Sequence, residues 1–164
     1  MEANHSTSDS TKLNHFNPNC VSEIQLFYKT EIRPVDRPII SSPEHAFMIF
    51  KHYWDKSQIQ LREEFKMLLL NQAHRALGIV SISSGGVSST TVDPKLVFST
   101  ALVANASSLI VAHNHPSGNL IPSESDIKMT NKLNSGGMLL DISVLDHLIL
   151  TSDGYCSMKD EGYI

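Results

Sequence analysis

The sequence predicts an α/β (α+β) fold in which helices flank a mixed β-sheet. From residue 59 onward, hydrophobic periodicity and turn residues give the element order β-β-α-β-α-β-β, which favours helices packed on a sheet. The apolar run in 63–71 is nearly continuous, as expected for a strand covered on both faces. The chain has 164 residues, of which 41% are hydrophobic and 18% charged, so it is long enough for one domain with a substantial core.

Three segments are expected along the chain. Residues 1–20 are rich in Ser, Thr and Asn without an apolar period, which predicts a flexible N-terminal tail. Residues 21–58 are predicted to hold a flanking strand over 22–29 and a flanking helix, in which Ser42 is the N-cap and Pro43 the first helical residue. Residues 59–164 are expected to form the main domain.

The main domain is predicted to start with two strands over 63–71 and 74–83, joined as a hairpin. A loop at Gly85–Gly86 precedes a helix over 92–106, with Asp93 as its cap. The remaining elements are a strand over 107–114, a helix over 123–137 that begins at Ser123 and is stopped by Gly136–Gly137, and two short strands around Ser152–Gly154.

Composition excludes several classes of function. A net charge of −4 gives no basic surface for nucleic acid, and this argues against a nucleic-acid partner without ruling one out. There is no apolar run of the roughly 18 residues that a membrane span needs, and no signal pattern at the N-terminus, so a cytoplasmic protein without membrane contact is expected. The two cysteines, Cys20 and Cys156, form no C-x-x-C pair, so a metal site would need His and carboxylate ligands.

The segment 111–128, VAHNHPSGNLIPSESDIK, contains the candidate site. His113 and His115 stand at i and i+2 at the end of a predicted strand, where alternate side chains share one face. A helix that starts at Ser123 places Asp126 in its first turn, so His, His and Asp could bind one zinc ion. S-x-x-D is also close to a capping box, in which Ser123 bonds the backbone N–H of Asp126 and Asp126 reaches back. The residue pattern alone leaves both interpretations open.

The string H-x-H-P-x6-S-x2-D, here His113, His115, Pro116, Ser123 and Asp126, resembles the motif of the JAMM/MPN+ (JAB domain) zinc metalloprotease superfamily. The longer string AHNHPSGNLIPSESD, with VLDHLIL and GYCSMKDEG after it, resembles the bacterial RadC-like branch of that superfamily. The resemblance runs from about Glu63 to the C-terminus. It implies a cytidine-deaminase-like JAMM/MPN architecture for residues 59–164.

The resemblance also implies roles for individual residues. His113, His115 and Asp126 correspond to the zinc ligands. Ser123 is similar to the motif serine that hydrogen-bonds the zinc water or stabilises a developing oxyanion. The general base of the family is a glutamate on an earlier strand, which matches Glu63. Glu64 is the competing candidate, and because adjacent strand residues face opposite ways, only one of the two can reach the metal.

Two neighbouring residues receive structural interpretations. Asn114 lies between the two histidines and is expected to form hydrogen bonds in the loop or around the site. His147, in LDHLIL, is interpreted as a buried structural histidine in preference to a residue that supports the site.

The expected function is therefore zinc-dependent hydrolysis of an amide or isopeptide bond in a peptide-type substrate. Two alternatives stay open: a RadC-type DNA-repair-associated protein without peptidase activity, and a non-catalytic scaffold that binds a partner. The helical DNA-binding segment of larger family members is not recognisable in residues 1–58, which argues against the first. Zinc-dependent deamination is disfavoured because the P-C-x-x-C signature is missing. The sequence specifies neither the substrate nor an oligomeric state.

Overall fold

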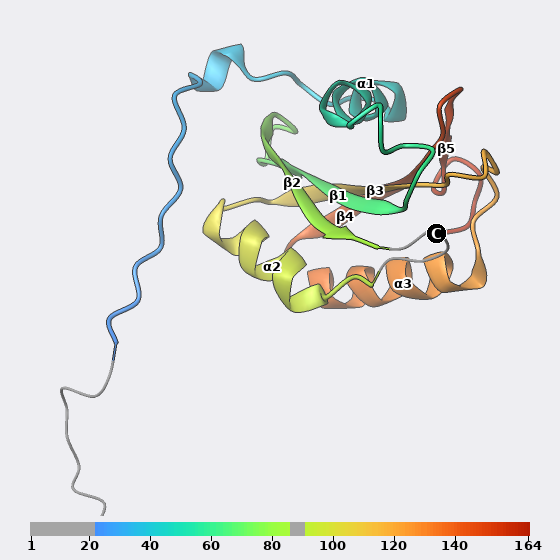
Figure 1. Ribbon diagram of the computed structural model, residues 1–164. Helices are drawn as coiled ribbons and strands as arrows, with labels where there is room; N and C mark the ends of the chain where they lie inside the picture. The colour runs from blue at the N-terminus through green and yellow to red at the C-terminus, as the bar shows by residue number, and fades with distance from the viewer. Residues whose placement is uncertain (1–21, 86–90) are drawn as a thin grey trace, which may run out of the picture.

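A five-stranded mixed sheet organises the residues that the computed structural model describes, which are 22–85 and 91–164 (Figure 1). The predicted tail, residues 1–20, and Gly86 of the predicted loop lie outside these ranges. The strands lie in the order β2-β1-β3-β4-β5 across the sheet. Their bounds are β1 Glu64–Leu70, β2 Ala76–Ser84, β3 Ser108–Asn114, β4 Ser143–Leu150 and β5 Tyr155–Ser157.

The strand pairing places the end of β3 in the middle of the sheet. β1 pairs antiparallel with β2, as the predicted hairpin requires, and its other edge pairs antiparallel with β3. β3 and β4 are parallel and are connected through helix α3, Glu124–Leu139. β5 returns antiparallel beside β4. The carboxyl end of β3 is therefore close to the start of α3, and the candidate residues occur at both places.

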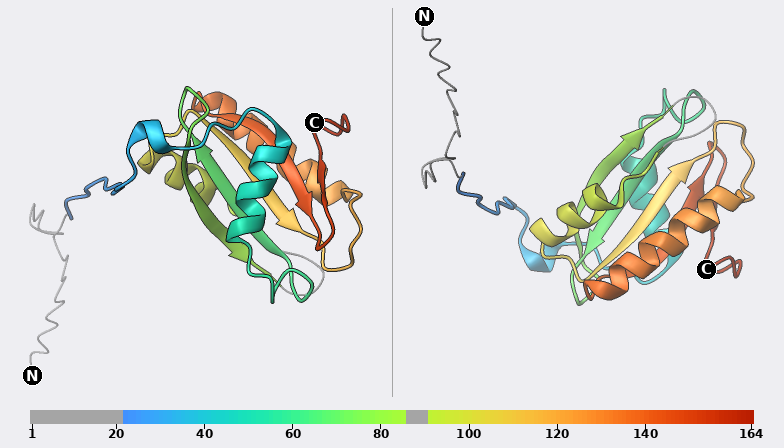
Figure 2. Two further views of the ribbon diagram at one scale, coloured as in Figure 1. Left: turned by 90° about the horizontal axis from the view of Figure 1, so that it is seen from above. Right: turned by 90° about the horizontal axis from the view of Figure 1, so that it is seen from below.

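Helices cover both faces of the sheet. Helix α1, Pro43–Tyr53, lies across one face, whereas α2, Pro94–Val103, and α3 lie across the other (Figure 2). The predicted caps are present: the side chains of Ser42 and Asp93 accept hydrogen bonds from backbone N–H groups of the first turns of α1 and α2. A short 3-10 helix, η2 Pro34–Asp36, precedes α1.

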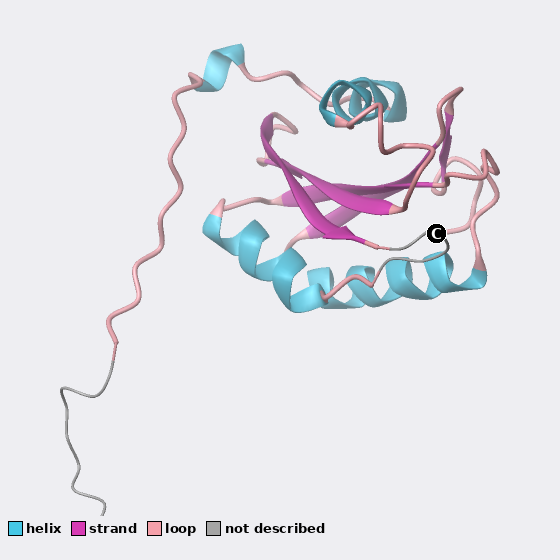
Figure 3. Cartoon of the chain, in the orientation of Figure 1, coloured by secondary structure: helices cyan, strands magenta, loops and turns pink. Residues whose placement is uncertain are grey.

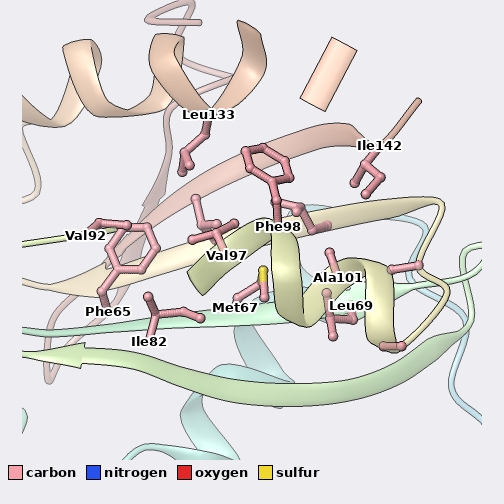
Figure 4. Close-up of a cluster of buried hydrophobic side chains, with 14 residues drawn as sticks. Phe65, Met67, Leu69, Ile82, Val92, Val97, Phe98, Ala101, Leu133 and Ile142 are labelled. Atoms are coloured by element: carbon pink, nitrogen blue, oxygen red, sulfur yellow. The ribbon is translucent and has the colours of Figure 1, made fainter. Parts of the chain in front are cut away.

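Two apolar clusters pack on the two faces, which explains the continuous apolar runs. All residues of β1 and β3 are buried. From β1, Phe65 and Met67 point toward α2 and α3 (Figure 4), whereas Leu68 points toward α1. The mixed sheet with helices on both sides confirms the predicted fold class.

The strand predicted over 22–29 is wrong. The structure has no strand in this segment, which is drawn as loop in Figure 3. Ile24, Leu26 and Phe27 are 77–86% exposed, so the loose alternation of apolar residues does not correspond to a buried face. The Tyr28 hydroxyl donates to the carbonyl of Leu77 in β2, but the backbone forms no ladder there. A strand needs a partner as well as a pattern.

The predicted end of the last helix is also wrong, because α3 continues through Gly136 and Gly137 to Leu139. Both glycines allow close packing instead of ending the helix. A Cβ atom at Gly136 would lie 2.7 Å from Cε2 of Phe98, and one at Gly137 would collide with the backbone carbonyl of Ile142. The absence of a side chain lets the last turns of α3 approach α2 and the start of β4.

Among the helices in 22–85 and 91–164, none has both the length and the apolar character needed to span a membrane.

Candidate metal centre

The end of β3 places His113 and His115 on one face. His113 pairs with Phe65 in β1 and with Ile149 in β4. The ladder extends one residue past the strand, because the backbone N–H of His115 donates to the carbonyl of Leu150 at 2.9 Å. The i and i+2 side chains therefore project together, as expected, and their Nε2 atoms are 2.9 Å apart.

Asp126 meets the two histidines from the first turn of α3. Its Oδ1 lies 3.3 Å from Nε2 of His113, and its Oδ2 lies 3.8 Å from Nε2 of His115. One ligand atom from each of the three residues lies within 4.8 Å of the other two. The structure thus brings together the three residues predicted as metal ligands, from two elements separated by a loop.

Ser123 caps the same helix. Its hydroxyl oxygen accepts from the backbone N–H of Asp126, and Oδ2 of Asp126 accepts from the backbone N–H of Ser123 at 2.7 Å. The Ser123 hydroxyl also donates to Oδ2 of Asp126 at 2.6 Å. The capping box is therefore present in the same place as the ligand cluster, and it orients the Asp126 carboxylate.

The environment keeps Asp126 ionised. Partial burial raises the pKa of its carboxyl, but the contact with His113 and the hydrogen bonds from Ser123 outweigh burial, so the pKa lies well below its ordinary value. An anionic oxygen beside two imidazoles is a donor set that can bind zinc.

His147 supports the cluster from β4. It is paired with Val111 and so shares the face of β3 that carries His113. Its Nε2 lies 2.7 Å from Nδ1 of His113, and its Nδ1 lies 2.6 Å from the hydroxyl of Thr130 in α3. Burial lowers the pKa of His147 well below its ordinary value. Of the two interpretations of His147, the buried position fits the favoured structural one, and the contact with His113 also fits the alternative in which His147 supports the site. Thr130 had no signal in the sequence.

Glu63 and Glu64 face opposite ways, as strand alternation requires. Glu63 lines the cavity in front of the histidines. Glu64 is buried and does not line this cavity. Its Oε2 lies 3.5 Å from Nζ of Lys66, and the Lys66 ammonium lies over the Trp54 ring. Of the two candidate bases, Glu63 is the one that the structure places beside the ligand cluster.

Asn114, the last residue of β3, forms hydrogen bonds with the segment that contains Glu63. Its side chain is fully buried. The side-chain oxygen accepts from the backbone N–H of Glu64 at 2.7 Å, and the amide nitrogen donates to the carbonyls of Ile59 and Arg62 at 2.7 and 2.9 Å. Asn114 thus has the hydrogen-bonding role expected from the sequence. Its side chain holds the backbone on both sides of Glu63.

The ligand cluster opens into a cavity of about 250 Å³. Polar and apolar side chains both line it. Ser125, which the sequence analysis did not single out, also faces it, and its hydroxyl lies 2.7 Å from that of Ser123. The lining residues are Glu63, Phe65, Val92, His113, His115, Ser123, Ser125, Asp126, Met129 and His147.

The profile of one known domain family, described as the RadC-like JAB domain, matches residues 40–163. The chain belongs to this family. The RadC-like JAB match starts at residue 40 and so includes α1, whereas the sequence pattern places this helix in a flanking segment over 21–58. It also covers the ligand cluster, Glu63 and the cavity.

Relatives carry the name UPF0758 protein. The one from Desulfitobacterium hafniense is 40% identical over 134 residues, covering 80% of this chain and 56% of the relative. The one from Thermosynechococcus vestitus is 42% identical over 130 residues, covering 78% of this chain and 50% of the relative. The one from Flavobacterium johnsoniae is 45% identical over 100 residues, covering 61% of this chain and 44% of the relative. This RadC-like chain spans about half the length of these curated relatives.

Proposed function

We propose that this RadC-like JAB domain is a zinc-dependent hydrolase of amide or isopeptide bonds in a peptide-type substrate. The observation that carries the proposal is the convergence of three ligand atoms, the Nε2 atoms of His113 and His115 and a carboxylate oxygen of Asp126, at the wall of a cavity. Membership of a JAB family, whose superfamily includes hydrolases, supports the same reaction class.

The donor chemistry of His115 fits a metal ion. Its Nδ1 lies 2.6 Å from the backbone carbonyl oxygen of Asn119, which can only accept, so Nδ1 carries the proton. A neutral ring then has a bare lone pair on Nε2, which points at Nε2 of His113 2.9 Å away. Two imidazole nitrogens and one carboxylate oxygen are the ligand set of many catalytic zinc sites, which leave a fourth position open.

A zinc ion held by these residues would supply Lewis acidity, lowering the pKa of a coordinated water to about 7 and polarising a substrate carbonyl. In the proposal Glu63 accepts a proton from the attacking water and returns it to the departing amine. The Ser123 hydroxyl exchanges its hydrogen bond to Asp126 for one to the substrate oxygen that gains charge. The apolar lining residues Phe65, Val92 and Met129 would reduce the access of bulk water to the scissile bond.

The proposal is tested by measuring zinc content and amine release together. The zinc-loaded protein is incubated with a mixture of peptides and isopeptide-linked peptides and compared with the double variant H113A/H115A, with circular dichroism to check folding. We expect about one zinc per chain and new amino groups in the parent, and loss of both in the variant. A parent that binds no zinc, or hydrolysis that survives in the variant, contradicts the proposal. Salt-sensitive DNA binding without hydrolysis would favour a DNA-associated role instead.

A further inference from the structure

A chain of hydrogen bonds leads from the backbone of α3 through Thr130 and His147 to His113. We propose that Thr130 and His147 are positioning residues, which hold the ring proton of His113 on Nδ1 and thereby direct the Nε2 lone pair toward the metal. This inference rests on the proposed zinc function, but it specifies a proton position that can be observed without zinc.

The direction of the first hydrogen bond is fixed by a group that cannot donate. The Thr130 hydroxyl lies 2.6 Å from the backbone carbonyl oxygen of Asp126, one helical turn earlier. A carbonyl oxygen only accepts, so the single hydroxyl proton of Thr130 is used in this bond. Toward any other neighbour the Thr130 oxygen is then an acceptor.

The second hydrogen bond follows from the first. Nδ1 of His147 lies 2.6 Å from the Thr130 oxygen, so Nδ1 must carry the proton. Both side chains are almost entirely removed from solvent, at 1% exposure for His147 and 0% for Thr130. The hydrogen-bond partners of the ring within the described residues are Thr130 and His113, neither of which is anionic. A charged ring would therefore be buried without a contacting counter-ion, so a neutral ring with a bare Nε2 is the stable form.

The third hydrogen bond sets the tautomer of His113. The bare Nε2 of His147 lies 2.7 Å from Nδ1 of His113, which must therefore donate. A neutral His113 with its proton on Nδ1 has its lone pair on Nε2, the atom that faces His115 and Asp126. The Phe65 ring packs edge-on against His147 and parallel to His113, which restricts rotation of both rings. We call this chain of hydrogen bonds, from the Asp126 carbonyl through Thr130 and His147 to His113, the relay. It connects residues of α3, β4 and β3 and sets the protonation of one ligand atom, Nε2 of His113.

The test removes the acceptor at the start of the relay. In T130V the proton of His147 is expected to move to Nε2 and donate to His113, whose own proton then occupies Nε2, the metal-binding atom. Zinc affinity, measured by competition with a chromophoric chelator, should fall about 10- to 100-fold. T130S keeps the hydroxyl and should restore affinity to within about threefold of the parent, as judged on the same scale.

A matched control is available in α2. The Thr100 hydroxyl donates to the backbone carbonyl of Leu96, four residues earlier, at 2.7 Å, just as the Thr130 hydroxyl donates to that of Asp126. Thr100 is not among the residues that line the cavity. T100V should leave zinc affinity within about threefold of the parent, on the scale expected for residues around a metal site. The relay is overturned if T130V binds zinc as tightly as the parent does. It is also overturned if T100V loses as much zinc affinity as T130V.

A spectroscopic readout separates this inference from the zinc proposal. Two-bond ¹H–¹⁵N spectra of histidine-labelled, metal-free protein report which ring nitrogen of His147 is protonated. We expect the Nδ1–H tautomer in the parent and the Nε2–H tautomer in T130V. The Nε2–H tautomer or a charged ring in the parent overturns the relay. If the parent binds no zinc, the zinc proposal fails, and this spectrum still decides whether the relay exists.

Discussion

Replacing Asn114 with alanine should destabilise the fold by an amount that its contacts allow us to estimate. The side chain makes three hydrogen bonds, all with backbone groups on the segment that carries Glu63. A net hydrogen bond contributes about 0.5–1.5 kcal/mol, so the free energy of unfolding should fall by about 2–4 kcal/mol. The side chain is completely buried, so water cannot replace the lost partners without local opening.

The assay is urea unfolding of the metal-free parent and N114A, with linear extrapolation and the m-value checked for change. The matched control is N131A, because Asn131 is an exposed asparagine in α3, where substitution should change stability by no more than about 0.5 kcal/mol. In zinc-loaded protein, N114A should retain the metal but lose hydrolysis, because the backbone around Glu63 is no longer held. A stability loss below about 0.5 kcal/mol in N114A would refute the bridging role.

Three further outcomes are expected. Glu63→Gln should keep about one zinc per chain and lose hydrolysis, so turnover near the parent rate would reject Glu63 as the base. Ser123→Gly should cost only a few tenths of a kcal/mol of helix capping yet lower kcat about 100-fold, and unchanged kcat would show that the hydroxyl is only a cap. Gly137→Ala should lower the free energy of unfolding by about 1–3 kcal/mol, because its Cβ meets the Ile142 carbonyl, while zinc affinity stays unchanged; a stabilised variant would contradict this packing argument.

Local sequence signals were sufficient where short-range geometry decides the structure. The hairpin of β1 and β2, the caps at Ser42 and Asp93, and the same-face placement of His113 and His115 all follow from strand alternation or cap chemistry. From the sequence, the S-x-x-D pattern is consistent either with a capping box or with a ligand role for Asp126. The structure shows that the capping geometry and the ligand cluster share one carboxylate.

Features that depend on tertiary packing were not predictable from the sequence. Whether Ile24 and its neighbours find a partner strand depends on the rest of the sheet, and they do not. The sequence predicts that Gly137 ends the helix, because it does not show that the Ile142 carbonyl lies where a Cβ atom of residue 137 would be. The partners of His147 lie 17 and 34 residues away in the chain, on two other elements, so no local pattern connects them.

The side of the sheet that α1 covers was also beyond local inference. An amphipathic helix can pack on any apolar surface, and only the structure shows Phe50 and Trp54 packed with Leu68 of β1. The RadC-like JAB match, which begins at residue 40, includes this packed helix.

The most direct test of the central claim is the position of zinc in crystals of the zinc-loaded protein, located by anomalous scattering at the zinc absorption edge. We expect one peak per chain about 2.0–2.2 Å from Nε2 of His113, Nε2 of His115 and a carboxylate oxygen of Asp126. Glu63 should line the open side of that ion. A peak at other residues, or no peak in protein soaked with excess zinc, would contradict the assignment of His113, His115 and Asp126 as a zinc centre.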